Sequence, residues 1–96
     1  MYAGMTMFTM PPGMREKMEN LADQMLVGMK QMKGFVSITF LVNEETNEYG
    51  GIALWQTKED AEAAMTQTGA KLEQALAGST IGPLRRNLYE VYESQT

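Results

Sequence analysis

The amino-acid sequence predicts an α+β fold, and three observations carry that prediction. Residues 34–43 and 49–56 are both rich in β-branched and aromatic side chains and are separated by a polar corner, which is typical of an antiparallel hairpin. Apolar residues recur every three or four positions over 14–32 and again over 58–76, which predicts two amphipathic helices. A further strand-like stretch lies near each end of the chain.

The first predicted strand covers residues 2–10, where threonines alternate with larger apolar side chains. The prolines and glycine at 11–13 end it, because proline cannot donate to a sheet ladder. The helix predicted over 14–32 then stops before Gly34, a favourable residue for the position after a helix. Its apolar face consists of Met14, Met18, Leu21, Ala22, Met25, Leu26, Met29 and Met32. We interpret these methionines first as packing residues, although methionine also lines adaptable binding surfaces.

The two hairpin strands both have apolar residues on both faces. Alternation places Val36, Ile38, Phe40 and Val42 on one face of the first strand and Phe35, Ser37, Thr39 and Leu41 on the other. In the second strand, Gly51, Ala53 and Trp55 share one face, and Ile52, Leu54 and Gln56 share the other. A sheet with one solvated face should be polar on that face. We therefore expect both faces of this sheet to be covered.

The second helix is predicted over residues 58–76. Thr57 and Asp60 form a capping-box pattern with a shortened acid, which marks its start. The composition of residues 77–83 predicts a loop, and a last strand follows over about 86–93. The resulting order is strand, helix, strand, strand, helix, strand. It predicts a ferredoxin-like βαββαβ sandwich.

Length and composition exclude several kinds of protein. The 96 residues form one predicted domain, 1–96, with a net charge of −4, which argues against nucleic-acid binding. The chain has no cysteine and no histidine, so we expect no metal or haem and no other cofactor. It contains no apolar run of membrane-spanning length and no signal-peptide pattern at its start. A cytoplasmic protein without a membrane partner is the expectation.

Two short motifs connect the sequence to a known family. Residues 33–36 read Lys-Gly-Phe-Val, and residues 54–61 read Leu-Trp-Gln-Thr-Lys-Glu-Asp-Ala. With the order of elements, they resemble the antibiotic biosynthesis monooxygenase family of the dimeric α+β barrel superfamily. The likeness covers essentially the whole chain. The junction at Trp55, Thr57 and Glu59 is its most specific part.

This resemblance implies a homodimer in which two sheets pack face to face, with a ligand cavity between the sheet and the helices of each subunit. It also implies a cofactor-independent monooxygenase that acts on a small aromatic or polyphenolic compound. The catalytic residues of the family do not all match. Quinone-forming members use an asparagine four residues before the strand-three tryptophan, where this chain has Gly51. Haem-degrading members use a strand-one asparagine and a helix-two histidine, which this chain lacks.

Trp55 is the candidate catalytic residue, and Trp55, Met25 and Met29 are the candidate substrate-binding residues. The small residues Gly51 and Ala53 beside the indole leave room for either a ligand or a packed helix, and packing is the favoured interpretation. The pair Arg85-Arg86 is interpreted as solvated rather than as an anion site. A non-catalytic ligand-binding protein and a structural dimer remain as alternatives to the enzyme.

Overall fold

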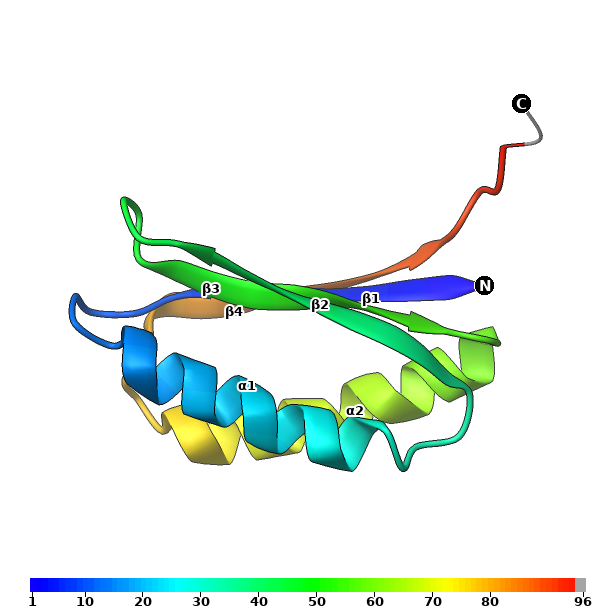
Figure 1. Cartoon of the computed structure of the whole chain (residues 1–96), viewed down its shortest axis with the longest axis horizontal. Coiled ribbons are helices and arrows are strands. Elements are labelled where there is room, and N and C mark those ends of the chain that lie inside the picture. The colour runs from blue at the N-terminus through cyan, green and yellow to red at the C-terminus, as the bar shows by residue number, and fades with distance from the viewer. Residues whose placement is uncertain (95–96) are drawn as a thin grey trace.

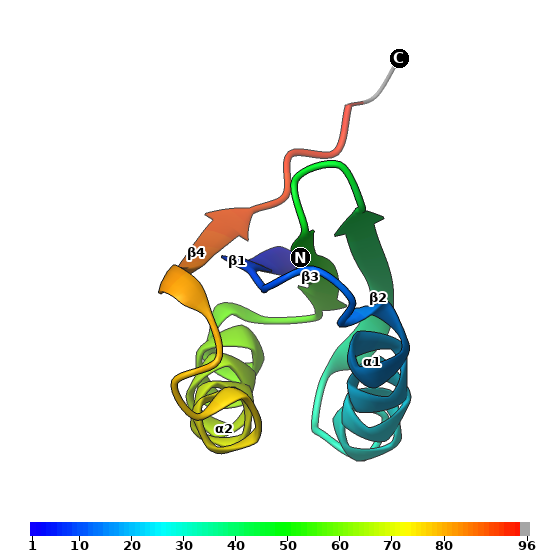
Figure 2. The same ribbon diagram turned by 90° about the vertical axis from the view of Figure 1, so that its left-hand side faces the viewer.

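The computed structural model describes residues 1–94. Its elements in chain order are β1 (Tyr2–Thr9), α1 (Arg15–Met29), β2 (Phe35–Asn43), β3 (Glu48–Trp55), α2 (Lys58–Leu76) and β4 (Ile81–Glu90). The strands form one antiparallel sheet in the order β2-β3-β1-β4. Both helices cover the same face of this sheet (Figure 1), and the end-on view places α1 below β2 and α2 below β4 (Figure 2). The ferredoxin-like α+β prediction is confirmed.

The face of the sheet that carries the core is the one that the alternation in β3 predicts. Gly51, Ala53 and Trp55 are buried beneath the helices, whereas the residues between them are only half-buried. In α2, the predicted start at Lys58 is confirmed, because the Thr57 hydroxyl accepts a hydrogen bond of 3.1 Å from the Asp60 N–H. This cap satisfies one of the free donors at the helix N-terminus.

One predicted face assignment in β2 is wrong. The register between β2 and β3 shifts between Phe35 and Ser37, so Phe35 lies opposite Trp55. Its ring contacts the indole edge to face, with centroids 5.6 Å apart and planes at 75°. An extra residue in one strand reverses the alternation beyond it. Phe35 therefore belongs to the core, although simple alternation placed it on the opposite face from Ile38.

The predicted end of the first helix is also too late. Helix α1 ends at Met29, and the N–H groups of Gln31 and Met32 donate to the carbonyls three residues earlier, at 3.2 and 3.0 Å. These bonds make a tighter turn that does not continue the α-helix. Gly34 still has a positive φ of 79°, and the Asp60 carboxylate lies where a side chain at this position would be.

The last strand begins earlier than predicted. It covers Ile81–Glu90, so residues 81–83 of the predicted loop belong to it, and residues 91–93 do not. Pro83 is tolerated because β4 is an edge strand that pairs only with β1. The register between these two strands shifts between Met7 and Thr9, and this irregularity lies next to the proline.

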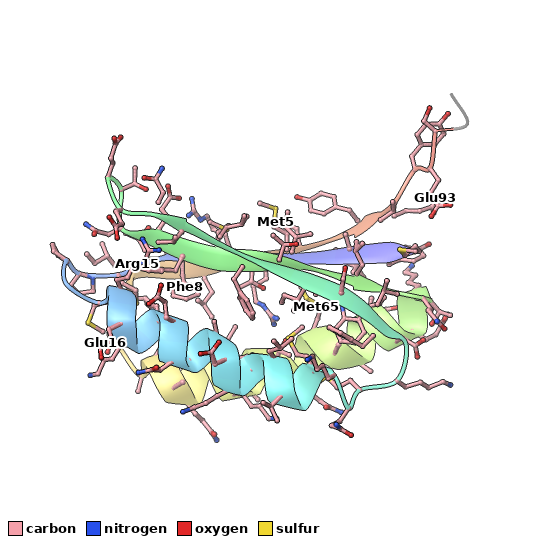
Figure 3. The ribbon with its side chains drawn as sticks, viewed as in Figure 1. Met5, Phe8, Arg15, Glu16, Met65 and Glu93 are labelled. Carbon is pink, nitrogen blue, oxygen red and sulfur yellow. The ribbon has the colours of Figure 1, made fainter. Side chains whose placement is uncertain are left out.

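The face of the sheet opposite the helices, here called the outer face, is largely apolar. Met5 projects from it, whereas Phe8 and Met65 lie between the sheet and the helices (Figure 3). The strand register places on the outer face Ala3, Met5, Met7, Ser37, Thr39, Leu41, Ile52, Leu54, Arg85, Asn87 and Tyr89. Leu41 and Tyr89 are 37% and 50% exposed. Neither helix in residues 1–94 is long and apolar enough to span a membrane.

Candidate functional site

A cavity of about 300 Å³ lies between the sheet and the two helices. Its residues come from β1, β2, β3, β4 and both helices, so the fold as a whole encloses it. The lining includes Gly4, Thr6 and Phe8 from β1, Gly51, Ala53 and Trp55 from β3, Met18, Met25 and Met29 from α1, and Met65, Thr68 and Leu72 from α2. Most of these side chains are apolar, which is typical of a pocket for an organic ligand.

The floor of the cavity carries small residues on its central strands, among them Gly4, Gly51 and Ala53. A side chain at Gly4 would approach the Met65 sulfur to 2.9 Å, and one at Gly51 would approach the Thr39 carbonyl oxygen to 2.9 Å. A larger residue at Gly51 would therefore clash with the backbone of β2, whereas at Gly4 the Met65 side chain would have to move. Methionines of α1 and α2 lie opposite this floor and can adjust to the ligand. The volume and the apolar lining suit a small organic molecule lying against the sheet.

The three residues proposed from the sequence all line this cavity. Trp55 forms part of its wall and is only 1% exposed, and Met25 and Met29 approach from α1. The indole N–H makes no hydrogen bond to any residue in 1–94. The packing role is also real, because Trp55 belongs to a buried cluster with Ala53, Ala61 and other residues. Its role in binding remains a prediction.

The structure adds Arg86, which the sequence interpretation treated as solvated. Arg85 does lie on the surface and pairs with Glu48 at 2.7 Å. Arg86 instead points between the sheet and α2 and lines the cavity. Its Nε donates to the Thr6 hydroxyl at 3.0 Å, Nη1 to the Met65 carbonyl at 2.6 Å, and Nη2 to the Thr68 hydroxyl at 2.8 Å. The interpretation of Arg86 as solvated is therefore wrong.

The strand pattern contained a signal for this orientation. Leu84, Arg86 and Leu88 alternate, so the face that carries two leucines also carries the arginine. Gly69 of α2 provides the space, since a side chain there would lie 2.5 Å from Arg86 Nη1. From the sequence alone, Gly69 is only an interruption of the helical pattern over 58–76. It is the position that lets a guanidinium pack against α2.

Arg86 carries a positive charge with no ion-pair partner in residues 1–94. Burial lowers the pKa of its guanidinium, and the more distant Glu73 carboxylate partly opposes that effect. Arginine remains protonated in proteins despite such shifts. On its β4 and α2 side, the cavity therefore holds a cation whose partners in residues 1–94 are two hydroxyls, one carbonyl and one thioether.

The opposite end of the cavity opens between α1 and the edge strand β2. Its lining there includes exposed residues of both elements, Arg15, Glu19, Phe40 and Val42. Arg15 donates to Glu19 at 3.2 Å and to Glu44 at 2.5 Å, and it lies at the start of α1 (Figure 3). Such exposed ion pairs add little stability. Their position makes them the border of the opening.

The described part of the chain contains no cluster of three or more carboxylates placed to hold a metal ion. Apart from Arg15 and Glu19 at its opening, the polar groups of the cavity are hydroxyls, an indole, a phenol and a guanidinium, from Thr6, Thr68, Trp55, Tyr49 and Arg86. The Tyr49 ring stacks on Phe8, with centroids 6.4 Å apart. This set can orient an organic molecule by apolar contact and hydrogen bonding.

The fold and the cavity together define a class, a ferredoxin-like α+β domain with a ligand-sized space between its sheet and helices. The family model described as "Putative mono-oxygenase ydhR" matches residues 6–96, so the chain belongs to that family. The predicted resemblance to the antibiotic biosynthesis monooxygenases is confirmed. No match was found among curated proteins.

Several solved structures share the fold. A monooxygenase of Streptomyces coelicolor from the gene ActVA-Orf6, in complex with nanaomycin D, is 17% identical, with 99% of this chain and 90% of that chain covered and a TM-score of 0.78. SnoaB, a cofactor-independent oxygenase from Streptomyces nogalater, is 21% identical, with 98% and 95% covered and a TM-score of 0.75. Rv0793 from Mycobacterium tuberculosis is 12% identical, with 99% and 98% covered and a TM-score of 0.76.

Proposed function

We propose that this protein is a cofactor-independent monooxygenase that oxidises a small aromatic or polyphenolic compound. The observation that carries the proposal is the cavity, with glycines on its floor, a tryptophan in its wall and Arg86 without a carboxylate partner on one side. Membership in a monooxygenase family supports it. SnoaB, which has the same fold, is a cofactor-independent oxygenase, and the Streptomyces coelicolor monooxygenase was solved with a small ligand.

The chemistry needs no group beyond the substrate and O2. An ionised phenol gives up electrons to O2, and one oxygen atom bonds to a ring carbon. The other oxygen atom leaves as water, with the hydroxyl hydrogen of the phenol and the hydrogen that was on that ring carbon. The product is a quinone, so atoms and electrons balance. The chain supplies orientation and a cavity from which water is excluded. In this proposal Trp55 contacts the ring, and Met25 and Met29 cover it.

Oxygen uptake tests the proposal. Purified protein with a panel of mono- and dihydroxynaphthalenes is expected to consume O2 without added metal or flavin, and isotopically labelled O2 should place one labelled atom in the quinone. Replacing Met25 with tryptophan fills the cavity and should abolish uptake, because the ring would compete with the substrate. Met5→Leu, on the outer face, is the matched control and should keep full activity.

A non-catalytic ligand-binding protein is the second candidate. It is favoured by the absence of histidine and by Gly51, which occupies the position of the catalytic asparagine in quinone-forming relatives. The same panel separates the two. Quenching of Trp55 fluorescence by a naphthol without oxygen uptake would support binding alone, and the single tryptophan makes this signal specific.

The outer face supports a homodimer as the second part of the proposal. Its apolar residues lie opposite the helices, and a second copy would cover them by a symmetric face-to-face contact. Sedimentation is expected to give about twice the 10.7 kDa chain mass. Met5→Glu should yield a monomer, because it places a charge at the centre of this face.

Val27→Glu is the control for this experiment, since Val27 is 69% exposed on α1, away from the outer face. Both variants add the same charge to the surface. A wild-type protein that sediments as a monomer at micromolar concentration, or a Met5→Glu protein that stays dimeric, would contradict the face-to-face dimer.

A further inference from the structure

Arg86 has hydrogen-bonding capacity that the protein does not use. A guanidinium has five N–H bonds. Four contacts are made, from Nε to Thr6, from Nη1 to the Met65 carbonyl, and from Nη2 to the Thr68 hydroxyl and the Met65 sulfur, the last at 3.5 Å. One N–H on Nη1 therefore has no partner in residues 1–94. The charge itself also has no carboxylate beside it in that part of the chain.

The Thr6 and Thr68 hydroxyls, both beside Arg86, differ in whether their own proton is already donated to the protein. Thr68 is buried and donates its proton to the Ala64 carbonyl at 2.7 Å, so its oxygen only accepts from Arg86. Thr6 also accepts from Arg86, but its own proton is donated to no residue in 1–94. The Thr6 hydroxyl lines the cavity. This end therefore offers two hydrogen-bond donors and one positive charge.

We propose that the cavity takes its ligand as an anion, with the negative oxygen of a phenolate or enolate bound by Arg86 and by the Thr6 hydroxyl. Charge-assisted hydrogen bonds of this kind are shorter and stronger than neutral ones. The remaining cavity suits the ligand because its floor carries glycines and most of its other lining residues are apolar. The ligand class is thus an aromatic compound with an acidic hydroxyl group.

This inference deepens the proposed function and rests on it for the aromatic class. The anion site would do the work of a general base, since the chain has no histidine to remove a proton from the substrate. A cation beside the hydroxyl favours its ionised form without a dedicated base. The charged groups nearest to this end are Arg86 itself and, further along α2, Glu73, whereas Arg15 and Glu19 border the opposite end.

Arg86 also contributes to stability, and that contribution is measured separately from binding. Its guanidinium donates to the Thr6 hydroxyl, the Met65 carbonyl and the Thr68 hydroxyl. Replacing it with methionine removes the donor from these acceptors, and an acceptor that is buried without a partner costs stability. We therefore expect Arg86→Met to unfold at a lower urea concentration than the wild type and to lose the preference for an anionic ligand. A purely structural arginine would give the first effect without the second.

The experiment uses the full-length protein with a nitronaphthol, whose phenolate has its own visible absorption band, and with its methyl ether, which cannot ionise. Binding is followed by quenching of Trp55 fluorescence under nitrogen, so no turnover is involved. Wild-type protein is expected to bind the phenolate about tenfold more tightly than the ether and to lower the apparent pKa of the bound phenol by about one unit. Arg86→Met should lose both effects. Arg85→Met, the same substitution one residue away on the outer face, should keep them.

A second variant keeps the proposal testable if Arg86→Met does not fold. Gly69→Ala places a methyl group at 2.5 Å from Arg86 Nη1 and should displace the guanidinium, with a similar loss of preference. Gly28→Ala, also inside a helix, meets only the Lys71 amino group at 3.4 Å and should change nothing in binding. An equal affinity of wild-type protein for phenolate and ether, or a preference that survives both variants, would overturn the proposal. Oxygen uptake is measured separately, so a protein that binds the anion without oxidising it contradicts only the enzyme.

Discussion

Replacing Trp55 with alanine is expected to lower the free energy of unfolding by about 3–5 kcal/mol. The indole is 1% exposed, and the Phe35 ring packs against it edge to face at 5.6 Å. Its other buried neighbours include Ala53, Ala61 and Ala64, whose short side chains cannot move in to fill the space. Urea unfolding followed by circular dichroism measures the loss, since the variant has no tryptophan to report it.

Trp55→Phe separates the packing role from the ligand role. Phenylalanine keeps the apolar contact with Phe35 but loses the indole N–H, which has no partner in the described part of the chain. We expect a smaller loss of stability than for alanine and an affinity for a naphthol weaker by a factor of about 2–12, which corresponds to an aromatic contact of 0.5–1.5 kcal/mol. A Trp55→Phe protein that binds as tightly as the wild type would limit Trp55 to packing.

Gly50→Ala is expected to be as damaging as a large core deletion, although it adds a single methyl group. A side chain at Gly50 would overlap the backbone carbonyl of Thr6 and lie 2.5 Å from the Met7 sulfur. The sulfur can move, but the carbonyl belongs to the central strand β1 and cannot move without disturbing the pairing on both sides. We expect a loss of about 3 kcal/mol or more, at the upper end of the cost of overpacking.

Gly28→Ala is expected to stabilise the protein, although the same substitution at Gly50 destabilises it. It lies inside α1 and meets only the flexible end of Lys71. Alanine is favoured over glycine in a helix interior by up to about 1 kcal/mol. Thermal unfolding should therefore show a higher Tm for Gly28→Ala and a much lower one for Gly50→Ala. Equal effects at the two positions would mean that the β1–β3 contact is looser than the structure indicates.

The order of elements and most of the core could be predicted because the signals are local. The alternation of Gly51, Ala53 and Trp55 and the cap at Thr57 depend on neighbouring residues alone. The errors in the strands arose where pairing with another strand decides the outcome. The shift beside Phe35 depends on β3, and the start of β4 at Ile81 depends on the free edge of β1.

The residues of the candidate site also divide into those that local patterns predict and those that depend on other segments. Trp55, Met25 and Met29 could be placed in one cavity because strand and helix periods identify the faces that meet. Arg86 could not be placed there, because residues far from it in the sequence form its surroundings. They are Thr6 on β1, Thr68 on α2, and Gly69, whose lack of a side chain leaves room for the guanidinium. An arginine beside another arginine suggests a solvated surface until those distant partners are known.

The position of β1 in the sheet has a consequence for how the chain folds. Tyr2 lies opposite Trp55 on one side and Glu90 on the other, whereas the β2–β3 hairpin closes locally with Asn43 opposite Glu48. Local pairings form quickly, and distant ones require the closure of long loops. In a chain emerging from the ribosome, the hairpin and then β1 can assemble while β4 is still enclosed. Because Arg86 lies on β4, the apolar floor of the cavity would then form before the side that carries the cation.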